Sequence, residues 1–230
     1  MLNTQMYNSL SANVFGNIPE HIDFPVAFEP TLVPHKKYVV NANTGQYLDT
    51  VGHKFNCASH PDFFRGVQDT MIEELNSPDL EDVKVTFRTA RNGAWAMMDT
   101  TFPNVKVRVE TLKHTTDIAQ RVIALHGIDG SCSNQVFYGG IDFFCTNGMI
   151  SGEYDTVRRK NTLMFSLDKF IDELRNAKQD FYAHGRKLQT WASTHVSHDQ
   201  VKLMLEEVLK SDSKADKMMN VYNMEAAQRG

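Results

Sequence analysis

The chain has 230 residues, of which 41% are hydrophobic and 23% charged, and its formal net charge is −4. These values are ordinary for a globular protein, and the length suits one domain, or one core with a helical appendage. No apolar run approaches the roughly 18–20 residues that a membrane helix needs. The polar N-terminal segment also lacks the pattern of a secretory signal. We therefore expect a cytoplasmic protein that is not embedded in a membrane.

The three cysteines are Cys57, Cys132 and Cys145, an odd number without a Cys-x-x-Cys pair. This spacing differs from that of a disulfide framework or a zinc knuckle. We expect reduced thiols, no metal site and no cofactor.

Residues 1–35 have the composition of an extended arm. Four prolines recur among isolated apolar residues, which disfavours a helix: Pro19, Pro25, Pro30 and Pro34. Such an arm can pack on its own domain or on a neighbouring subunit. Residues 36–230 are predicted to form a single α+β domain with a β-rich core at 36–163 and a helical region at 164–230.

The β-rich core is predicted to be a twisted, mainly antiparallel sheet with one helix packed on it. Short strands are expected at 38–40, 46–48 and 54–57, and a helix at 61–75. Later strands are expected at 121–126 and 135–144.

The clearest pattern is a hairpin centred on Asn92-Gly93. Residues 83–88 alternate apolar and polar side chains, and so do residues 105–110. A two-residue loop at 92–93 pairs Arg88 with Met97 and Ala90 with Trp95, which places these side chains on one face. The opposite face is expected to be buried through Val85, Phe87, Val107 and Val109.

A basic, exposed face follows from this alternation. It is expected to carry Lys84, Arg88, Trp95, Lys106 and Arg108, and a second basic cluster is Arg158-Arg159-Lys160. Residues 84–121 hold seven Lys or Arg against three Asp or Glu. Cations that bind phosphates and an aromatic ring that stacks on a base are the combination used by single-strand binders. The alternatives are a solvated basic strand face and a Trp95 buried by the arm or the C-terminal helices.

The helical region begins at a Ser166 cap, with apolar residues repeating at heptad spacing to His195. Ser197 and Gln200 form a capping box that opens a second helix, and a third helix begins near Lys214. Apolar stripes are expected to point inward: Val201, Met204, Leu205, Val208 and Leu209 in the second helix, and Ala215, Met218, Met219 and Tyr222 in the third. The helical pattern still continues at Gly230, so we expect the natural protein to extend further.

No motif predicts a catalytic or metal-binding residue. A hydrolase or nuclease would need His126, Asp129 and another carboxylate to converge, whereas the glycine-rich turn favours an Asp129 that bonds its own backbone. His195 and His198 fall on either side of a helix start, which does not suit a shared metal. We therefore expect a protein that is not an enzyme.

Several short motifs resemble a phage and plasmid protein family of unknown function. They are Tyr47-Leu48, Val51-Gly52, Phe55, the turn Asp129-Gly130-Ser131, and Cys145-Thr146-Asn147-Gly148-Met149. The chain departs from this family at Asp142, where an arginine is usual, and at Asn161, where a histidine is usual. Family members usually continue into an aromatic-containing tail. The resemblance implies a phage or plasmid setting without implying a reaction.

The predicted order of elements is also similar to that of phage single-strand annealing proteins. The leading hypothesis is therefore single-stranded DNA binding or annealing in phage or plasmid recombination, by a homo-oligomer without catalysis. The alternative is a phage accessory protein that acts by protein–protein contact with a host system.

Overall fold

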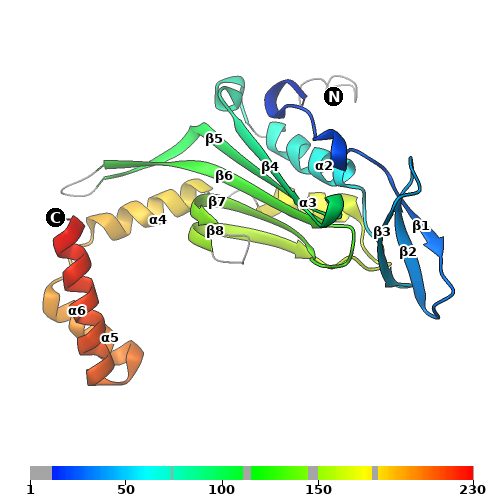
Figure 1. The fold of residues 1–230 in the computed structure, drawn as a ribbon. Helices are drawn as coiled ribbons and strands as arrows, with labels where there is room; N and C mark the ends of the chain where they lie inside the picture. The colour runs from blue at the N-terminus through cyan, green and yellow to red at the C-terminus, as the bar shows by residue number, and fades with distance from the viewer. Residues whose placement is uncertain (1–11, 74, 111–114, 145–149, 178–180, 230) are drawn as a thin grey trace. The chain divides into compact units, whose positions relative to one another are not determined.

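The computed structural model describes residues 12–229 except 74, 111–114, 145–149 and 178–180. The chain forms two compact units, Met1–Leu188 and Gln189–Gly230. Two antiparallel sheets, of three and five strands, lie in the first unit together with helices (Figure 1). The predicted α+β class, with a mainly antiparallel sheet and C-terminal helices, is confirmed. No helix in the described part of the chain is long and apolar enough to cross a membrane.

The smaller sheet has the order β1-β2-β3 and comprises β1 (Val26–Pro30), β2 (Lys36–Asn41) and β3 (Tyr47–Gly52). Strand β1 lies within the segment that we predicted to be an extended arm. Its proline, Pro30, is tolerated because β1 is an edge strand, where a missing N–H breaks no ladder bond. The strand predicted at 54–57 is wrong, since that segment has no regular structure.

The larger sheet has the strand order β4-β5-β6-β7-β8, and every neighbouring pair is antiparallel. Its strands are β4 (Lys84–Ala90), β5 (Trp95–Glu110), β6 (Thr115–Gly127), β7 (Asn134–Phe144) and β8 (Ile150–Arg159). The return strand of the predicted hairpin and the alternating segment 105–110 are one long strand, β5, whose register with β6 shifts between Phe102 and Lys106.

The predicted register of the β4–β5 hairpin is confirmed. Arg88 lies opposite Met97 and Ala90 opposite Trp95. The loop differs from the two-residue turn, because pairing stops at Ala90 and a 3-10 turn occupies Arg91–Gly93. Asn92 adopts left-handed backbone angles there (φ 53°, ψ 36°), which asparagine tolerates better than most residues.

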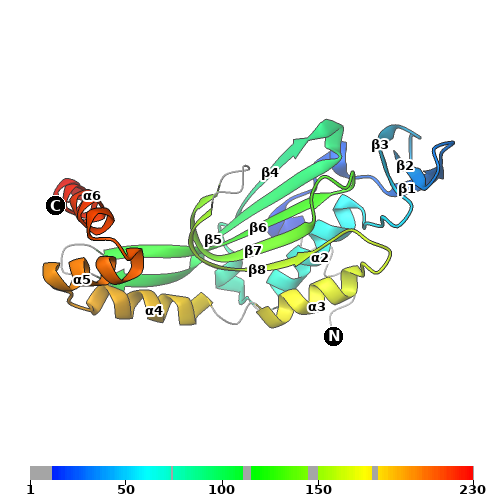
Figure 2. The ribbon, with the colours of Figure 1, turned by 90° about the horizontal axis from the view of Figure 1, so that it is seen from below.

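Helices α2 (His60–Ile72) and α3 (Leu167–Ala177) cover one face of the five-stranded sheet (Figure 2). Ser59 caps α2 by accepting the Asp62 N–H, and Pro61 occupies the first turn, where no N–H is needed. The core between helices and sheet is built from Phe63, Phe64, Phe170 and Leu174 against Met98, Phe102, Val122 and Val136. The predicted arm packs on this same core, since Phe15, Ile18 and Ile22 are buried in it.

Strands β5 and β6 continue past the rest of the sheet as a two-stranded ribbon. Pairing of β4 stops at Thr101 and that of β7 at Arg121, whereas β5 and β6 remain paired out to Glu110 and Thr115. Helix α4 (Phe181–Ser193) packs closely against the ribbon, because a Cβ on Gly185 would meet the Val107 side chain at 2.5–2.9 Å. The position is therefore restricted to glycine by packing.

We expect Gly185→Ala to destabilise the protein by about 1–2 kcal/mol. Overpacking costs about 1–3 kcal/mol, and so close an approach to a branched side chain belongs in the upper part of that range, about 2–3 kcal/mol. The better helix propensity of alanine offsets about 1 kcal/mol of it. Urea unfolding measures the change. The same substitution made in a Val107→Ala background should cost less, because the shorter side chain leaves room for the new methyl group. A Gly185→Ala protein as stable as the wild type would contradict this close approach.

The second unit holds α5 (His198–Leu209) and α6 (Asp212–Arg229), which form an antiparallel helical hairpin. The capping box predicted at Ser197 and Gln200 is confirmed. The helix predicted from Ser166 to His195 is described in two parts, α3 and α4, and residues 178–180 between them lie outside the described residues. The predicted inward stripes are partly wrong, because Met204, Val208, Met218 and Tyr222 are exposed. One helix–helix contact is too narrow to cover such wide apolar stripes.

Candidate nucleic-acid interface

The face of the five-stranded sheet opposite α2 and α3, here called the outer face, carries most of the predicted site residues. The strand registers define its rows of side chains. One row runs from Arg88 through Met97, Leu125 and Gln135 to Arg158. Arginines therefore stand at both ends of this row, on the two edge strands.

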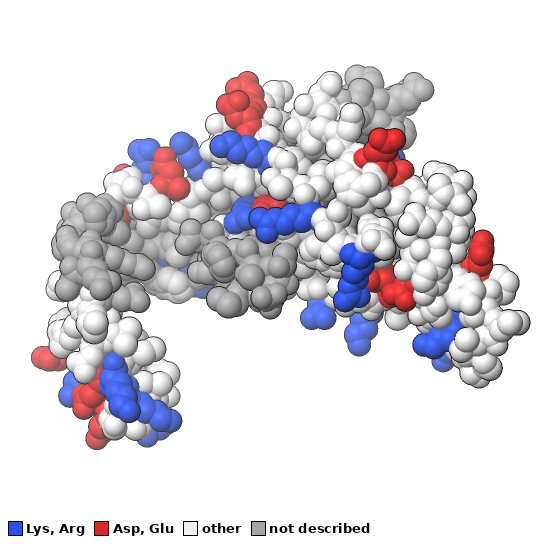
Figure 3. All heavy atoms as spheres, viewed as in Figure 1, with Lys and Arg blue, Asp and Glu red and all other residues white. Residues whose placement is uncertain are grey.

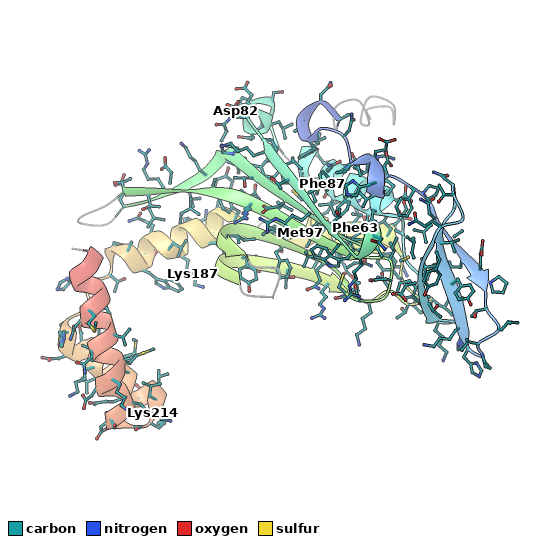
Figure 4. The ribbon with its side chains drawn as sticks, viewed as in Figure 1. Phe63, Asp82, Phe87, Met97, Lys187 and Lys214 are labelled. Atoms are coloured by element: carbon teal, nitrogen blue, oxygen red, sulfur yellow. The ribbon has the colours of Figure 1, made fainter. Side chains whose placement is uncertain are left out.

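The centre of the outer face is apolar and buried. Met97 and Ile123 are fully buried, and Phe137 and Ile141 nearly so, although they lie on the side away from α2 and α3. Met97 from β5 and Phe63 from α2 therefore mark the two sides of the sheet (Figure 4). The outer face thus combines an apolar centre with charged edges, which a simple solvated strand face would not do.

Trp95 lies at the border of this apolar centre. Its side chain is half-buried against the Met97 cluster, and its indole N–H donates a hydrogen bond to the Cys132 thiol. The hydrogen bond and the packing fix the ring in place. The side chain is half-buried, in contrast to the fully buried Trp95 of the alternative considered from the sequence.

Lys84 and Arg88 lie on β4 with exposed side chains. Neither forms an ion pair with another residue that the structure describes. Arg88 is the diagonal cross-strand neighbour of Trp95, and such neighbours lie about 7–8 Å apart. An unpaired cation and an aromatic ring are therefore within reach of one nucleotide.

Lys106 and Arg108 are exposed on the ribbon and share one carboxylate. Asp117 accepts Arg108 Nε at 2.9 Å and lies 3.2 Å from Lys106 Nζ. These hydrogen bonds, that from Arg108 first, lower the pKa of Asp117 to about 2. The group of three thus carries one net positive charge. The register shift reverses the alternation of β5, because Phe102 faces the helix side before it and Val105 and Val107 face that side after it. Lys106 and Arg108 therefore lie on the same face as Arg88.

The ion pair between Arg121 and Asp99 was not predicted from the sequence. Arg121 donates from Nε and Nη2 to the two carboxylate oxygens at 2.8 and 2.6 Å, and both side chains are largely buried. The pair lies on the outer face, one row from Met97. Recognising it would have required the β5–β6 register between Trp95 and Phe102.

The predicted basic cluster at 158–160 is divided by the sheet. Arg158 belongs to the outer face and donates to Ser133 Oγ at 2.7 Å. Arg159 points to the helix side, where it binds Glu173 of α3 at 2.6 Å, and Lys160 follows the strand. Figure 3 accordingly shows basic side chains spread over the viewed face, several with an acidic neighbour, rather than one continuous patch.

The helix-side residues predicted to be buried are Val85, Phe87, Val107 and Val109, and all four are half-buried. Val85, Phe87 and Val107 pack against the main core. The predicted division between an apolar helix side and an exposed basic side therefore holds, with less burial than expected.

The residues considered for a hydrolase make contacts that hold the fold together. His126 is fully buried on the helix side and hydrogen-bonds His60, with 2.8 Å between the two Nδ1 atoms. Asp129 binds Arg91 at 3.1 Å and accepts the Ser131 N–H at 2.9 Å. The predicted turn in which Asp129 bonds its own backbone is confirmed.

Cys57 and Cys132 are free thiols, and Cys145 lies outside the described residues. Burial raises the pKa of Cys57 to about 12 and that of Cys132 to about 11, so neither thiol is a ready nucleophile. Among the described residues, no three His, Cys, Asp or Glu side chains are grouped so that they could hold a metal ion.

Comparison with known proteins gives one family. A family model described as "Domain of unknown function (DUF932)" matches residues 47–229. No curated protein matches the chain. No solved structure matches it either.

Proposed function

Because the chain belongs to the DUF932 family, whose description assigns no activity, we propose its function from the outer face: it binds single-stranded nucleic acid without catalysis. The observation that carries the proposal is the placement of Arg88 beside Trp95. Arg88 has no ion-pair partner among the described residues, so it is available to a phosphate, and the fixed indole is available to a base.

The two edges of the outer face support a strand that crosses the sheet. Lys84 and Arg88 lie at the β4 edge and Arg158 at the β8 edge, with the apolar Met97 cluster between them. A strand lying across this face would place phosphates at the edges and a base on Trp95, at the border of the apolar centre. The finer role that we propose is strand annealing by a cytoplasmic homo-oligomer in phage or plasmid recombination. It rests on the resemblances in sequence and in the order of elements.

The test is the salt dependence of oligonucleotide binding. Binding is measured by the fluorescence anisotropy of a labelled oligothymidylate. Each phosphate neutralised on a single strand contributes a slope of about 0.7 in log K against log salt. Lys84→Ala with Arg88→Ala should weaken binding and flatten the slope by about 1.4. This double variant is a clearer test than Arg108→Ala, because without Arg108 the remaining Lys106 is still paired with Asp117.

The matched control removes two cations from the helix side, Arg159→Ala with Lys169→Ala, and should leave the slope unchanged. Absence of binding by the wild type at low salt would contradict the proposal. So would an equal loss of slope in the control variant.

A second candidate is an accessory protein that acts by contact with another protein. The exposed apolar side chains of α5 and α6 favour it. Loss of a host-protein complex, rather than of oligonucleotide binding, would distinguish it.

A further inference from the structure

The α5–α6 hairpin has one polar and one apolar side. Ala215 and Met219 are buried, and Lys202 of α5 bridges to Asp216 of α6 at 3.1 Å on the polar side. Helical spacing places two residues of each helix on the opposite side. These are Met204 (55% exposed), Val208 (72%), Met218 (51%) and Tyr222 (48%), here called the hairpin face.

The hairpin face leaves the second unit with little core of its own. Helices of 12 and 18 residues joined by a short loop form one contact, and units of about 40 residues are rarely stable without a further partner. The hairpin face therefore needs an apolar partner surface.

Among the described residues of Met1–Leu188, exposed large apolar side chains do not gather on one element as they do on the hairpin face. Leu32 and Val33 lie in the loop after β1, Leu163 and Met164 in the loop after β8, and Tyr47 and Tyr182 are single residues of β3 and α4. Among the described residues, the best apolar partner surface for the hairpin face is therefore the hairpin face of a second copy of the chain.

The charges beside the hairpin face are also complementary to a second copy. Helical spacing puts Glu207 at its α5 border and Lys214 at its α6 border, and both are exposed without an ion pair among the described residues. Lys214 is labelled beside the α5–α6 loop in Figure 4. Both residues lie about one helical turn from that loop, so they are at the same height along the hairpin.

We propose that two copies of the chain associate through the hairpin face to form a four-helix bundle. With a two-fold axis parallel to the helices, α5 of one copy packs on α6 of the other. Glu207 of each copy then faces Lys214 of the other, twice in the dimer. This association supplies the homo-oligomer of the proposed function, but it is measured without nucleic acid, so either proposal can fail while the other stands.

The experiment is sedimentation velocity of the full chain over a range of concentrations. The wild type should be a dimer, and Val208→Glu or Met218→Glu should yield monomers, because each places two buried carboxylates in the interface. Leu203→Glu is the matched control: it is exposed on α5 but lies away from the hairpin face, and should remain dimeric. Circular dichroism checks that the helices persist.

Charge reversal tests the arrangement within the dimer. Glu207→Lys and Lys214→Glu should each weaken association roughly tenfold, because two symmetric pairs change from attraction to repulsion. The double variant should recover most of the wild-type affinity. A monomeric wild type, a dimeric Val208→Glu protein, a monomeric Leu203→Glu protein or a double variant without recovery would each overturn the proposal.

Discussion

Acidification from pH 6.5 to pH 5 is expected to lower the free energy of unfolding by at least 2 kcal/mol, at about 1.4 kcal/mol per pH unit for each of two buried histidines. The two are His60, at the start of α2, and His126 in β6. Both side chains are fully buried, and the His126 ring stacks on Phe63 with 4.5 Å between ring centroids.

The hydrogen bonds of His60 and His126 determine which ring nitrogen of each histidine carries the proton. His60 Nε2 lies 2.8 Å from the Gly93 carbonyl oxygen, which can only accept, so Nε2 carries the proton of neutral His60. His60 Nδ1 then accepts from His126 Nδ1–H at 2.8 Å. His126 Nε2 is left bare, and no described residue is its partner. A further proton would enter either a buried site without an acceptor or the space between the two rings.

The sign of the effect follows from the direction of the shifts. Burial lowers the pKa of His60 to about 4, and burial, followed by the nearby His60, lowers the pKa of His126 well below its ordinary value. Above pH 6.5 both histidines are neutral in the folded and the unfolded chain. Below pH 6.5 the two histidines bind protons in the unfolded chain and stay neutral in the folded chain. The free energy of unfolding therefore falls as the pH falls, until the pH reaches the pKa of the folded state.

Urea unfolding between pH 5 and pH 7.5 measures this dependence. His126→Phe keeps a ring against Phe63 and removes one buried base, so it should reduce the slope by up to about 1.4 kcal/mol per pH unit. Asp69, whose pKa is raised by burial and by Glu73, contributes with the opposite sign in both proteins and cancels in the comparison. Equal slopes in the two proteins would show that the pair is not kept neutral by the fold.

The β4–β5 hairpin shows how much of the site the sequence could predict. Alternation on both strands and the Asn92-Gly93 turn were enough to place Arg88 opposite Met97 and beside Trp95. The bulge after Phe102 did not disturb this, because the valines at 105 and 107 keep their own alternation toward the core. Local patterns therefore fixed the register wherever one face is buried.

The features that were missed depend on contacts between distant segments. Strand β8 was not predicted, so Arg158 and Arg159 were taken as one cluster, although neighbours on a strand point to opposite faces. The pairing of Lys106 and Arg108 with the single carboxylate of Asp117 depends on the contact with β6, whose register no local signal fixes. Strand β1 was not predicted, because its segment contains prolines, which disfavour a strand except at the edge of a sheet.

Trp95→Ala is expected to weaken oligonucleotide binding by about 5- to 150-fold, the equivalent of roughly 1–3 kcal/mol for one stacked base. The slope against salt should hardly change, because stacking releases no counterions. Loss of Lys84 and Arg88 should instead change the slope against salt. Salt titrations of the variants therefore separate stacking on Trp95 from phosphate contacts with the two cations. Trp95→Phe keeps a ring for stacking and loses only the bond to Cys132, so it should retain most of the affinity.

The control for Trp95→Ala must separate stacking from damage to the apolar centre. Met97→Ala removes a fully buried neighbour from the same cluster, and a fully buried side chain cannot contact a strand. It should lower the thermal transition while changing affinity by less than the loss in Trp95→Ala. If Met97→Ala weakens binding as much as Trp95→Ala does, the indole acts through packing alone. A strand would then be held by the cations at the edges of the sheet, without a stacked base.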